Sequence, residues 1–343
     1  MNREAMTRGI ICSLVDRILK EAETDPERTV RKLVDLGGQL VKGRFQSYFF
    51  GMVQTMLEDE DSAYYELARR VCTQVDREAL KTLGVNLGYN SCTLGARTIR
   101  EREAAEGYSI PWAVMFRMQS GGTLPPEEYE RFIQEGTALG IRSYIFYAED
   151  KKIDLEPVLE RMAAHKDCAF LLALPAAIVT EEVVSRVCEL QNLMVAPDSE
   201  DAEFPQAAQR LRRARRPYAC HRSCRGMEDL KDMESGAWAR RVVDAGCMFA
   251  FCHTEATCTD EICDRAARYV EETRRSQKEA VILSNYYTDH LFIGRVISGS
   301  PSFLGIRSDG MVNRCDGRRE VSTEICAKGK PLVDVLHQAA AKG

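Results

Sequence analysis

Cysteine and histidine side chains gather at two points of the sequence where short apolar segments end. Cys220-His221-Arg222-Ser223-Cys224 is one such point, and Cys252-His253-Thr254-Glu255 is the other. Thiolates and imidazoles are the ligands of tetrahedral zinc, and thiolates also hold iron–sulfur clusters. The candidate ligands of a zinc or iron–sulfur site are therefore Cys220, Cys224, Cys252, His253 and Cys258.

Several features of the sequence weigh against a metal at these residues. The CxxxC spacing of Cys220 and Cys224 is uncommon in zinc sites, and alternate residues on a strand face opposite ways. Cys263, the next cysteine, falls inside a predicted helix. The 13 cysteines are odd in number, and most stand among apolar residues as small hydrophobic side chains do. We therefore expect buried thiols, with metal binding as the less favoured interpretation.

Two other charged clusters are predicted to have no function: a solvated carboxylate pair and a basic helix end. The carboxylates of Glu149 and Asp150 could support acid–base chemistry, but Lys151 and Lys152 follow directly and would pair with them. The basic run from Arg210 to Arg216 ends a predicted helix, where the helix dipole favours cations. Neither cluster predicts a catalytic site, and no nucleic-acid partner is expected.

The cysteine-bearing segments belong to a region in which strand and helix patterns alternate. Between residues 108 and 280, strands are predicted near residues 110, 144, 169, 193, 217 and 248. The helix after the first strand repeats its apolar residues at helical spacing, at Tyr129, Phe132, Ile133, Gly136 and Leu139. Repeated right-handed crossovers of this kind predict an α/β partial barrel, whose functional rim is formed by the C-terminal ends of the strands.

The segments on either side of this region have different patterns. Residues 1–107 predict a helical N-terminal extension, with helices starting at Asp25 and Ser62 and a looser stretch at the glycines of 84–95. Residues 281–343 predict a C-terminal hairpin region, in which Asp309-Gly310 is the turn.

The residues around the first predicted helix resemble a known family. The pattern Leu124-x-x-Glu127-Glu128, followed by Ala138-Leu139-Gly140-Ile141-Arg142-x-Tyr144, is similar to the first helix and second strand of the radical S-adenosylmethionine (SAM) superfamily. The resemblance spans nearly the whole chain and implies that superfamily's six-unit TIM-like partial barrel, (β/α)6. It also implies a CxxxCxxC loop after the first strand, whose thiolates hold an iron–sulfur cluster that binds SAM.

This sequence departs from the family at both expected cofactor contacts. The loop after the first strand is Gln119-Ser-Gly-Gly-Thr123, and no cysteine stands between Cys92 and Cys168. After the second strand the chain has Ala148-Glu-Asp-Lys151, where the family has a Gly-Gly-Glu-Pro turn that contacts the SAM amino group. We therefore expect a degenerate member of the superfamily with no cofactor.

The composition of the chain and the missing CxxxCxxC motif together narrow the range of functions that we expect. With 343 residues, 45% of them hydrophobic, a formal charge of -5 and no long apolar run, the chain is predicted to be globular, cytoplasmic and without membrane contact. The preferred hypothesis is a binding module that serves as partner or regulator of an active radical SAM relative or carries a small ligand in the barrel. One alternative is an enzyme with a metal or iron–sulfur site built from the rim cysteines, and another is an active radical SAM enzyme with a displaced cluster.

Overall fold

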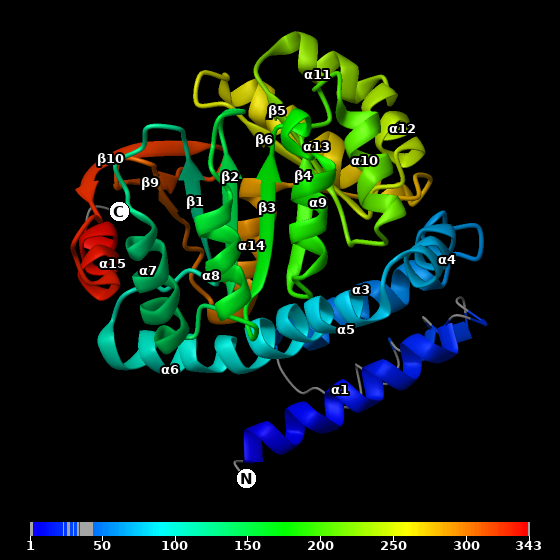
Figure 1. Ribbon diagram of the computed structural model, residues 1–343, viewed down its shortest axis with the longest axis horizontal. Helices are drawn as coiled ribbons and strands as arrows, with labels where there is room; N and C mark the ends of the chain where they lie inside the picture. The colour runs from blue at the N-terminus through cyan, green and yellow to red at the C-terminus, as the bar shows by residue number, and fades with distance from the viewer. Residues whose placement is uncertain are drawn as a thin grey trace.

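A curved sheet of mainly parallel strands forms the centre of the molecule, and helices cover its outer face (Figure 1). The computed structural model describes residues 3–22, 24–25, 28–29, 31–32, 34 and 44–341. One run of paired strands has the order β10-β9-β8-β1-β2-β3-β4 and a second has the order β5-β6-β7. Isolated bridges from Val195 to Tyr218 and from Asp198 to His221 join β4 to β5, so the two runs continue one another as a partial barrel.

The bounds of the elements are as follows. The strands are β1 (Ala113–Met118), β2 (Ser143–Ala148), β3 (Ala169–Leu174), β4 (Leu193–Pro197), β5 (Cys220–Cys224), β6 (Phe249–Thr254), β7 (Ile282–Asn285), β8 (Leu304–Ile306), β9 (Met311–Cys315) and β10 (Glu320–Cys326). The helices before β1 are α1 (Arg3–Ala22), α3 (Arg44–Leu57), α4 (Tyr64–Gln74), α5 (Arg77–Val85), a π-helix (Asn86–Gly95) and α6 (Ala96–Glu106). The later helices are α7 (Pro126–Leu139), α8 (Glu156–Ala164), a short 3-10 helix (Ala176–Ile178), α9 (Glu181–Cys188), α10 (Phe204–Arg213), α11 (Met227–Glu234), α12 (Ala237–Asp244), α13 (Asp260–Ser276), α14 (Tyr286–Ser298) and α15 (Leu332–Ala341).

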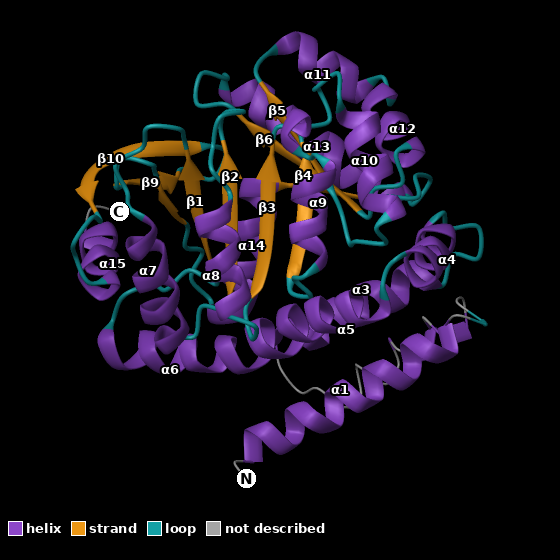
Figure 2. Cartoon of the chain, in the orientation of Figure 1, coloured by secondary structure: helices purple, strands orange, loops and turns teal. Residues whose placement is uncertain are grey.

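Strand alternation divides the core into an outer and an inner part. Val114 and Phe116 of β1 pack against the covering helices, together with the corresponding residues of β2 and β3. Met115 lies on the inner side with Tyr287 and Phe303. Because both faces of the strands are covered (Figure 2), they are apolar along most of their length, as the sequence predicted.

Helix α7 confirms the predicted first crossover. All five residues of its predicted apolar face are buried. Pro126 stands in the first turn, where its missing N–H costs no hydrogen bond, and Gly140 ends the helix with a φ of 99°. The loop, helix and strand that follow β1 therefore form where the sequence placed them.

The stretch predicted to be loose at residues 84–95 instead forms the end of α5 and the π-helix, which continues into α6 across the lower end of the strands (Figure 1). Asn86 and Asn90 fix it there, because their side-chain amides donate to the backbone carbonyls of Lys166, Asp167 and Cys168. A Cβ on Gly95 would lie 2.2 Å from the carbonyl oxygen of Gly140. Glycine is needed here for close helix packing and not for a flexible chain.

The region after residue 280 continues the sheet. Strand β7 pairs in parallel with β6, which adds a strand to the six that the sequence predicted. Strand β8 returns to pair in parallel with the free edge of β1, and β9 and β10 follow in antiparallel order. The predicted turn at Asp309-Gly310 is confirmed between β8 and β9, with a φ of 84° at Gly310.

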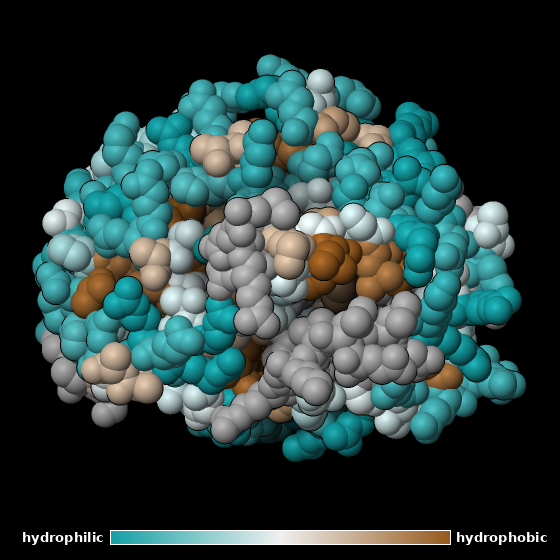
Figure 3. Space-filling model, turned by 90° about the horizontal axis from the view of Figure 1, so that it is seen from below, coloured by the Kyte–Doolittle hydropathy of each residue, from teal (hydrophilic) through white to brown (hydrophobic). Residues whose placement is uncertain are grey.

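No helix among the described residues is long and apolar enough to cross a membrane. Seen from below, the surface mixes hydrophilic and hydrophobic residues (Figure 3). Exposed apolar side chains on the N-terminal helices and α14 include Met6, Ile10, Tyr48 and Phe292. Much of the helix predicted from Asp25 lies outside the described residues.

Candidate functional site

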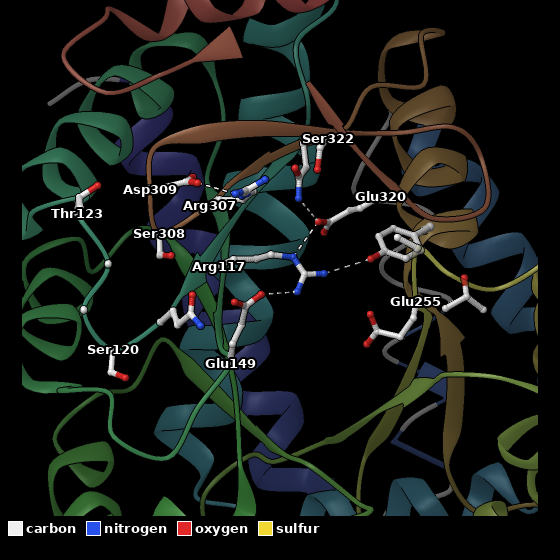
Figure 4. A pocket seen from close by; sticks show the side chains of 17 residues that line it. Arg117, Ser120, Thr123, Glu149, Glu255, Arg307, Ser308, Asp309, Glu320 and Ser322 are labelled. Carbon is white, nitrogen blue, oxygen red and sulfur yellow. Dashed lines mark hydrogen bonds and ion pairs between the residues drawn. The ribbon is translucent and has the colours of Figure 1, made fainter. Parts of the chain in front are cut away.

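A polar cavity of about 470 Å³ opens at the C-terminal ends of β1, β2 and β6, beside β8, β9 and β10 (Figure 4). This is the rim at which barrels of this kind bind ligands. Its lining residues are Arg117, Gln119, Ser120, Gly121, Gly122, Thr123, Glu149, Thr254, Glu255, Ala256, Tyr287, Arg307, Ser308, Asp309, Asn313, Glu320 and Ser322.

Arg117 stands at the centre of this cavity and is held from several sides (Figure 4). Its Nε donates to Glu320 Oε2 at 2.8 Å and its Nη1 to Glu149 Oε1 at 2.9 Å. The guanidinium also lies over the ring of Tyr147, 5.0 Å from the centroid. Burial alone would lower the pKa of Arg117, but Glu320, Tyr287 and Glu149 together outweigh it and the pKa is raised. The side chain is therefore a fixed cation with its donors directed at carboxylates.

Glu320 and Asn313 form a wall of the cavity whose hydrogen bonding is incomplete. Asn313 Nδ2 donates to Glu320 Oε2 at 2.6 Å, the same oxygen that accepts from Arg117. Both side chains are more than nine-tenths buried. Among the described residues, none donates to Glu320 Oε1 or to Asn313 Oδ1. Two adjacent acceptors are thus buried without donors, which is costly unless another group supplies them.

Glu255 lies at the end of β6 beside a pair of hydrogen-bonded side chains. His253 Nε2 is 2.8 Å from Ser223 Oγ and 3.6 Å from Glu255 Oε1. The contact with His253 lowers the pKa of Glu255 to about 2. Both contacts converge on the same imidazole nitrogen, whereas a Ser-His-acid triad uses the two nitrogens separately. The group is therefore no hydrolytic triad, and it leaves an ionised carboxylate facing the cavity.

Below the cavity, the inner face of the barrel carries Tyr147 and His221. The Tyr147 ring meets the edges of both His221 and His253, with centroids 5.2 and 5.4 Å apart. His221 Nδ1 is 2.8 Å from the carbonyl oxygen of Ala196, and burial lowers the pKa of His221 to about 4. Burial also raises the pKa of Tyr147 to about 12. This layer is polar but neutral at pH 7.

The loop Gln119–Thr123 forms one side of the cavity and is tied to its neighbours. Ser120 N–H donates to Asp150 Oδ2 at 2.7 Å, and Thr123 N–H donates to the carbonyl of Ser308 at 2.8 Å. A Cβ on Gly122 would lie 2.7 Å from the Cβ of Ser308. A second, smaller hollow of about 290 Å³ is lined partly by the same loop. The loop therefore packs against the turn between β8 and β9.

The five predicted metal ligands, all of them described residues, do not form a metal site. Strand alternation turns Cys220, Cys224 and Cys252 outwards into the core under the helices, while His253 points into the barrel. Cys252 Sγ lies 3.7 Å from Met233 Sδ, and Cys258 Sγ is 3.1 Å from the carbonyl oxygen of Cys224.

These thiols are also buried. Burial raises the pKa of Cys224 to about 12 and raises the pKa of Cys220, Cys252 and Cys258 as well. Within the part of the chain that the structure describes, no group of three or more His, Cys, Asp or Glu side chains is placed to hold a metal ion.

The carboxylate cluster is paired differently from the prediction, whereas the basic run ends helix α10 as predicted. Glu149 pairs with Arg117, and Lys151 pairs with Asp201, so the expected pairing with the adjacent lysines is wrong. The N–H groups of Ser120 and Lys152 lower the pKa of Asp150. The arginines of the basic run donate largely to backbone carbonyls of neighbouring segments; these residues are Arg210, Arg212, Arg215 and Arg216.

Sequence reasoning named Glu149, Glu255 and the loop Gln119–Thr123 but missed the three residues at the centre of the cavity: Arg117, Glu320 and Asn313. Arg117 was detectable, because it is a charged residue inside an otherwise apolar strand. Glu320 and Asn313 carried no such signal, since they stand among polar residues far from Arg117 in the sequence. They meet it only through the return of β8 to β1.

The iron–sulfur cluster implied by the resemblance can be tested against the residues at this rim. Three thiolates are required, and no cysteine is found among the described residues that line the cavity. The loop after β1 supplies only hydroxyl, amide and backbone groups. The residues present at this position do not fit the cluster.

Comparisons with known proteins concern the fold alone. No protein-family model and no curated protein sequence matches the chain. Among solved structures, the crystal structure of Streptococcus suis SuiB bound to S-adenosylmethionine is similar, with a TM-score of 0.50 and 12% sequence identity over 71% of this chain and 67% of that one. A second SuiB structure has a TM-score of 0.49 at the same identity. The chain thus has a mixed α/β, partial-barrel fold that is similar to the fold of SuiB.

Proposed function

We propose that this chain is a binding module that holds a small polar ligand in the rim cavity and carries out no cluster-dependent SAM chemistry. One observation carries the proposal: a polar cavity is present at the rim, and the loop Gln119–Thr123 beside it contains no cysteine and is held by hydrogen bonds. A cavity of about 470 Å³ lies within the size range of small-molecule sites.

The rigidity of the rim supports a binding role. Arg117 is fixed by Glu149 and Glu320, and these three residues come from β1, the end of β2 and β10. A ligand would enter a site whose charged groups are already ordered, so little side-chain entropy is lost on binding. The degenerate loop and the altered turn after β2 support the absence of a cluster.

Ligand binding is tested by thermal-shift screening of small polar metabolites against a variant with a blocked cavity. Ser322 lies in the lining, and a bulky ring there occupies the mouth, so Ser322→Trp is expected to abolish the shifts. The matched control is Val321→Trp, because Val321 is the adjacent, exposed residue of β10 and lies outside the lining. Equal shifts in both variants would contradict a ligand in this cavity.

The absence of cluster chemistry is tested by anaerobic reconstitution with iron and sulfide. We expect a colourless protein that does not cleave SAM under dithionite. Brown protein with a stoichiometric cluster and SAM cleavage would overturn this part of the proposal. This chain could also co-purify with a relative that carries the CxxxCxxC motif. If Ser322→Trp abolished that co-purification, the chain would be identified as a ligand-binding regulator of the relative.

A further inference from the structure

We infer that the ligand of the rim cavity presents a positively charged N–H group, an alkylammonium or guanidinium, to the wall formed by Glu255, Glu320 and Asn313. The inference rests on the proposed function, because it names the chemical class of ligand for the same cavity.

The charge of the lining favours a cation. Its charged side chains are two guanidiniums against four carboxylates, which gives a formal charge of -2; they are Arg117, Arg307, Glu149, Glu255, Asp309 and Glu320. In a cavity partly shielded from water, an excess of negative charge attracts cations more strongly than it would at an open surface.

Both arginines of the lining are already engaged. Arg117 directs its Nε and Nη1 at Glu320 and Glu149, and its Nη2 lies 3.5 Å from the hydroxyl of Tyr287. Arg307 pairs with Asp309 at 2.5 Å. An anionic ligand would therefore meet two guanidiniums whose charges are already balanced by neighbouring carboxylates.

The two buried polar atoms of this wall that have no hydrogen-bond partner among the described residues are both acceptors. A carboxylate cannot donate, so the contact with Glu320 fixes the Asn313 amide with Nδ2 towards that carboxylate and leaves Oδ1 as an acceptor. Glu320 Oε1 is the second acceptor without a donor among the described residues. Both atoms are closed to water, so binding must include a small rotation of one of these side chains towards the cavity. A group with several N–H donors, such as ammonium or guanidinium, can satisfy both.

Glu255 supplies a further negative charge at the mouth of the cavity. It lines the cavity, and its side chain is 41% exposed, so a ligand can reach it without displacing a packed residue. Its close partner is an imidazole and not a guanidinium or ammonium group. A ligand cation can therefore approach this carboxylate on its open side.

The test uses three probes of equal chain length: cadaverine, 1,5-pentanediol and glutarate. Isothermal titration at pH 7 and low salt is expected to detect cadaverine and not the other two. Glu255→Gln and Glu320→Gln each remove a charge with little change in shape, and each is expected to weaken cadaverine binding about tenfold. The control is Glu261→Gln, because Glu261 lies on α13 outside the lining.

The outcomes separate this inference from the proposed function. If glutarate or pentanediol bound in preference to cadaverine, and Ser322→Trp blocked that binding, the cationic ligand would be contradicted. The proposal that the cavity binds a small ligand would still be supported. Failure of every probe and every screened metabolite would overturn both. Because Glu320 is buried and its variant could unfold, Glu255→Gln alone decides the matter: undiminished cadaverine binding there contradicts the inference.

Discussion

Arg117 shows how a single buried charge organises the rim. Its guanidinium joins β1 to the end of β2 and to β10, three segments that are far apart in the sequence. A buried cation of this kind is stable only with its partners in place, since the loss of one partner leaves an uncompensated charge. Glu149 and Glu320 are these partners. Both line the cavity, and their carboxylates contribute to its negative charge.

His221 is expected to make the stability of the protein depend on pH. Burial lowers its pKa to about 4 from an ordinary value near 6.5, so the unfolded chain binds more protons between these values. Stability is therefore greatest above pH 6.5 and falls as the pH drops towards 4, by up to about 3 kcal/mol for a shift of this size. Urea unfolding at several pH values between 7 and 4 measures the decline.

The control for this prediction is His221→Asn, whose amide nitrogen can replace Nδ1 as the donor to Ala196. The variant should show a shallower decline over the same range. Parallel slopes for the two proteins would show that His221 is not the group responsible.

At the residue scale, the sequence indicated part of the rim where the site lies but not its central pair, Arg117 and Glu320. It pointed to the ends of β5 and β6, and His253 does lie at the rim. The cysteines could not be assigned to a face, because Cys220 and His221 are adjacent and a shift of one position in strand register exchanges inside and outside.

At the scale of elements, the π-helix and α7 meet through two glycines. A Cβ on Gly95 would clash with the backbone of Gly140, so Gly95→Ala should destabilise the protein by about 1–3 kcal/mol through overpacking. Urea or thermal unfolding followed by circular dichroism measures this loss.

The matched control is Gly88→Ala in the same π-helix, where nothing lies within 4 Å of the added Cβ. Alanine is the better helix former, so this change should be neutral or stabilising by up to about 1 kcal/mol. Equal losses in both variants would mean that helix geometry, and not the contact with Gly140, determines the effect.

The elements with strong apolar periodicity could be predicted, and those determined by tertiary contacts could not. Helix α7 has five apolar residues on one face and clear end signals. Strand β7 has only four residues, two of them polar, and becomes a strand because β6 offers its edge. The π-helix was missed because the packing of Gly95 outweighs the low helix propensity of glycine.

At the scale of the whole molecule, the helical extension and the barrel share one apolar cluster. Val75 and Leu83 from the α4–α5 region pack with Met194 and Met248 of the barrel. The two parts should therefore unfold in one cooperative transition. In a Trp112→Phe variant, the fluorescence of Trp238 reports on the barrel helix α12, and its transition should coincide with the circular dichroism of the whole chain.

Leu83→Ala tests the coupling directly. Truncation of this buried side chain should cost about 2–5 kcal/mol and lower both midpoints together. A shift in circular dichroism with an unchanged Trp238 transition would show two independent units.

The pairing of β8 with β1 also has a consequence for biosynthesis. During translation, β2 and β3 emerge soon after β1 and can pair along one side of it. The opposite edge of β1 must wait for the 185 residues between Met118 and Leu304 to leave the ribosome. Until then an apolar strand edge is open to other chains, so the nascent protein needs a chaperone or rapid elongation in that interval.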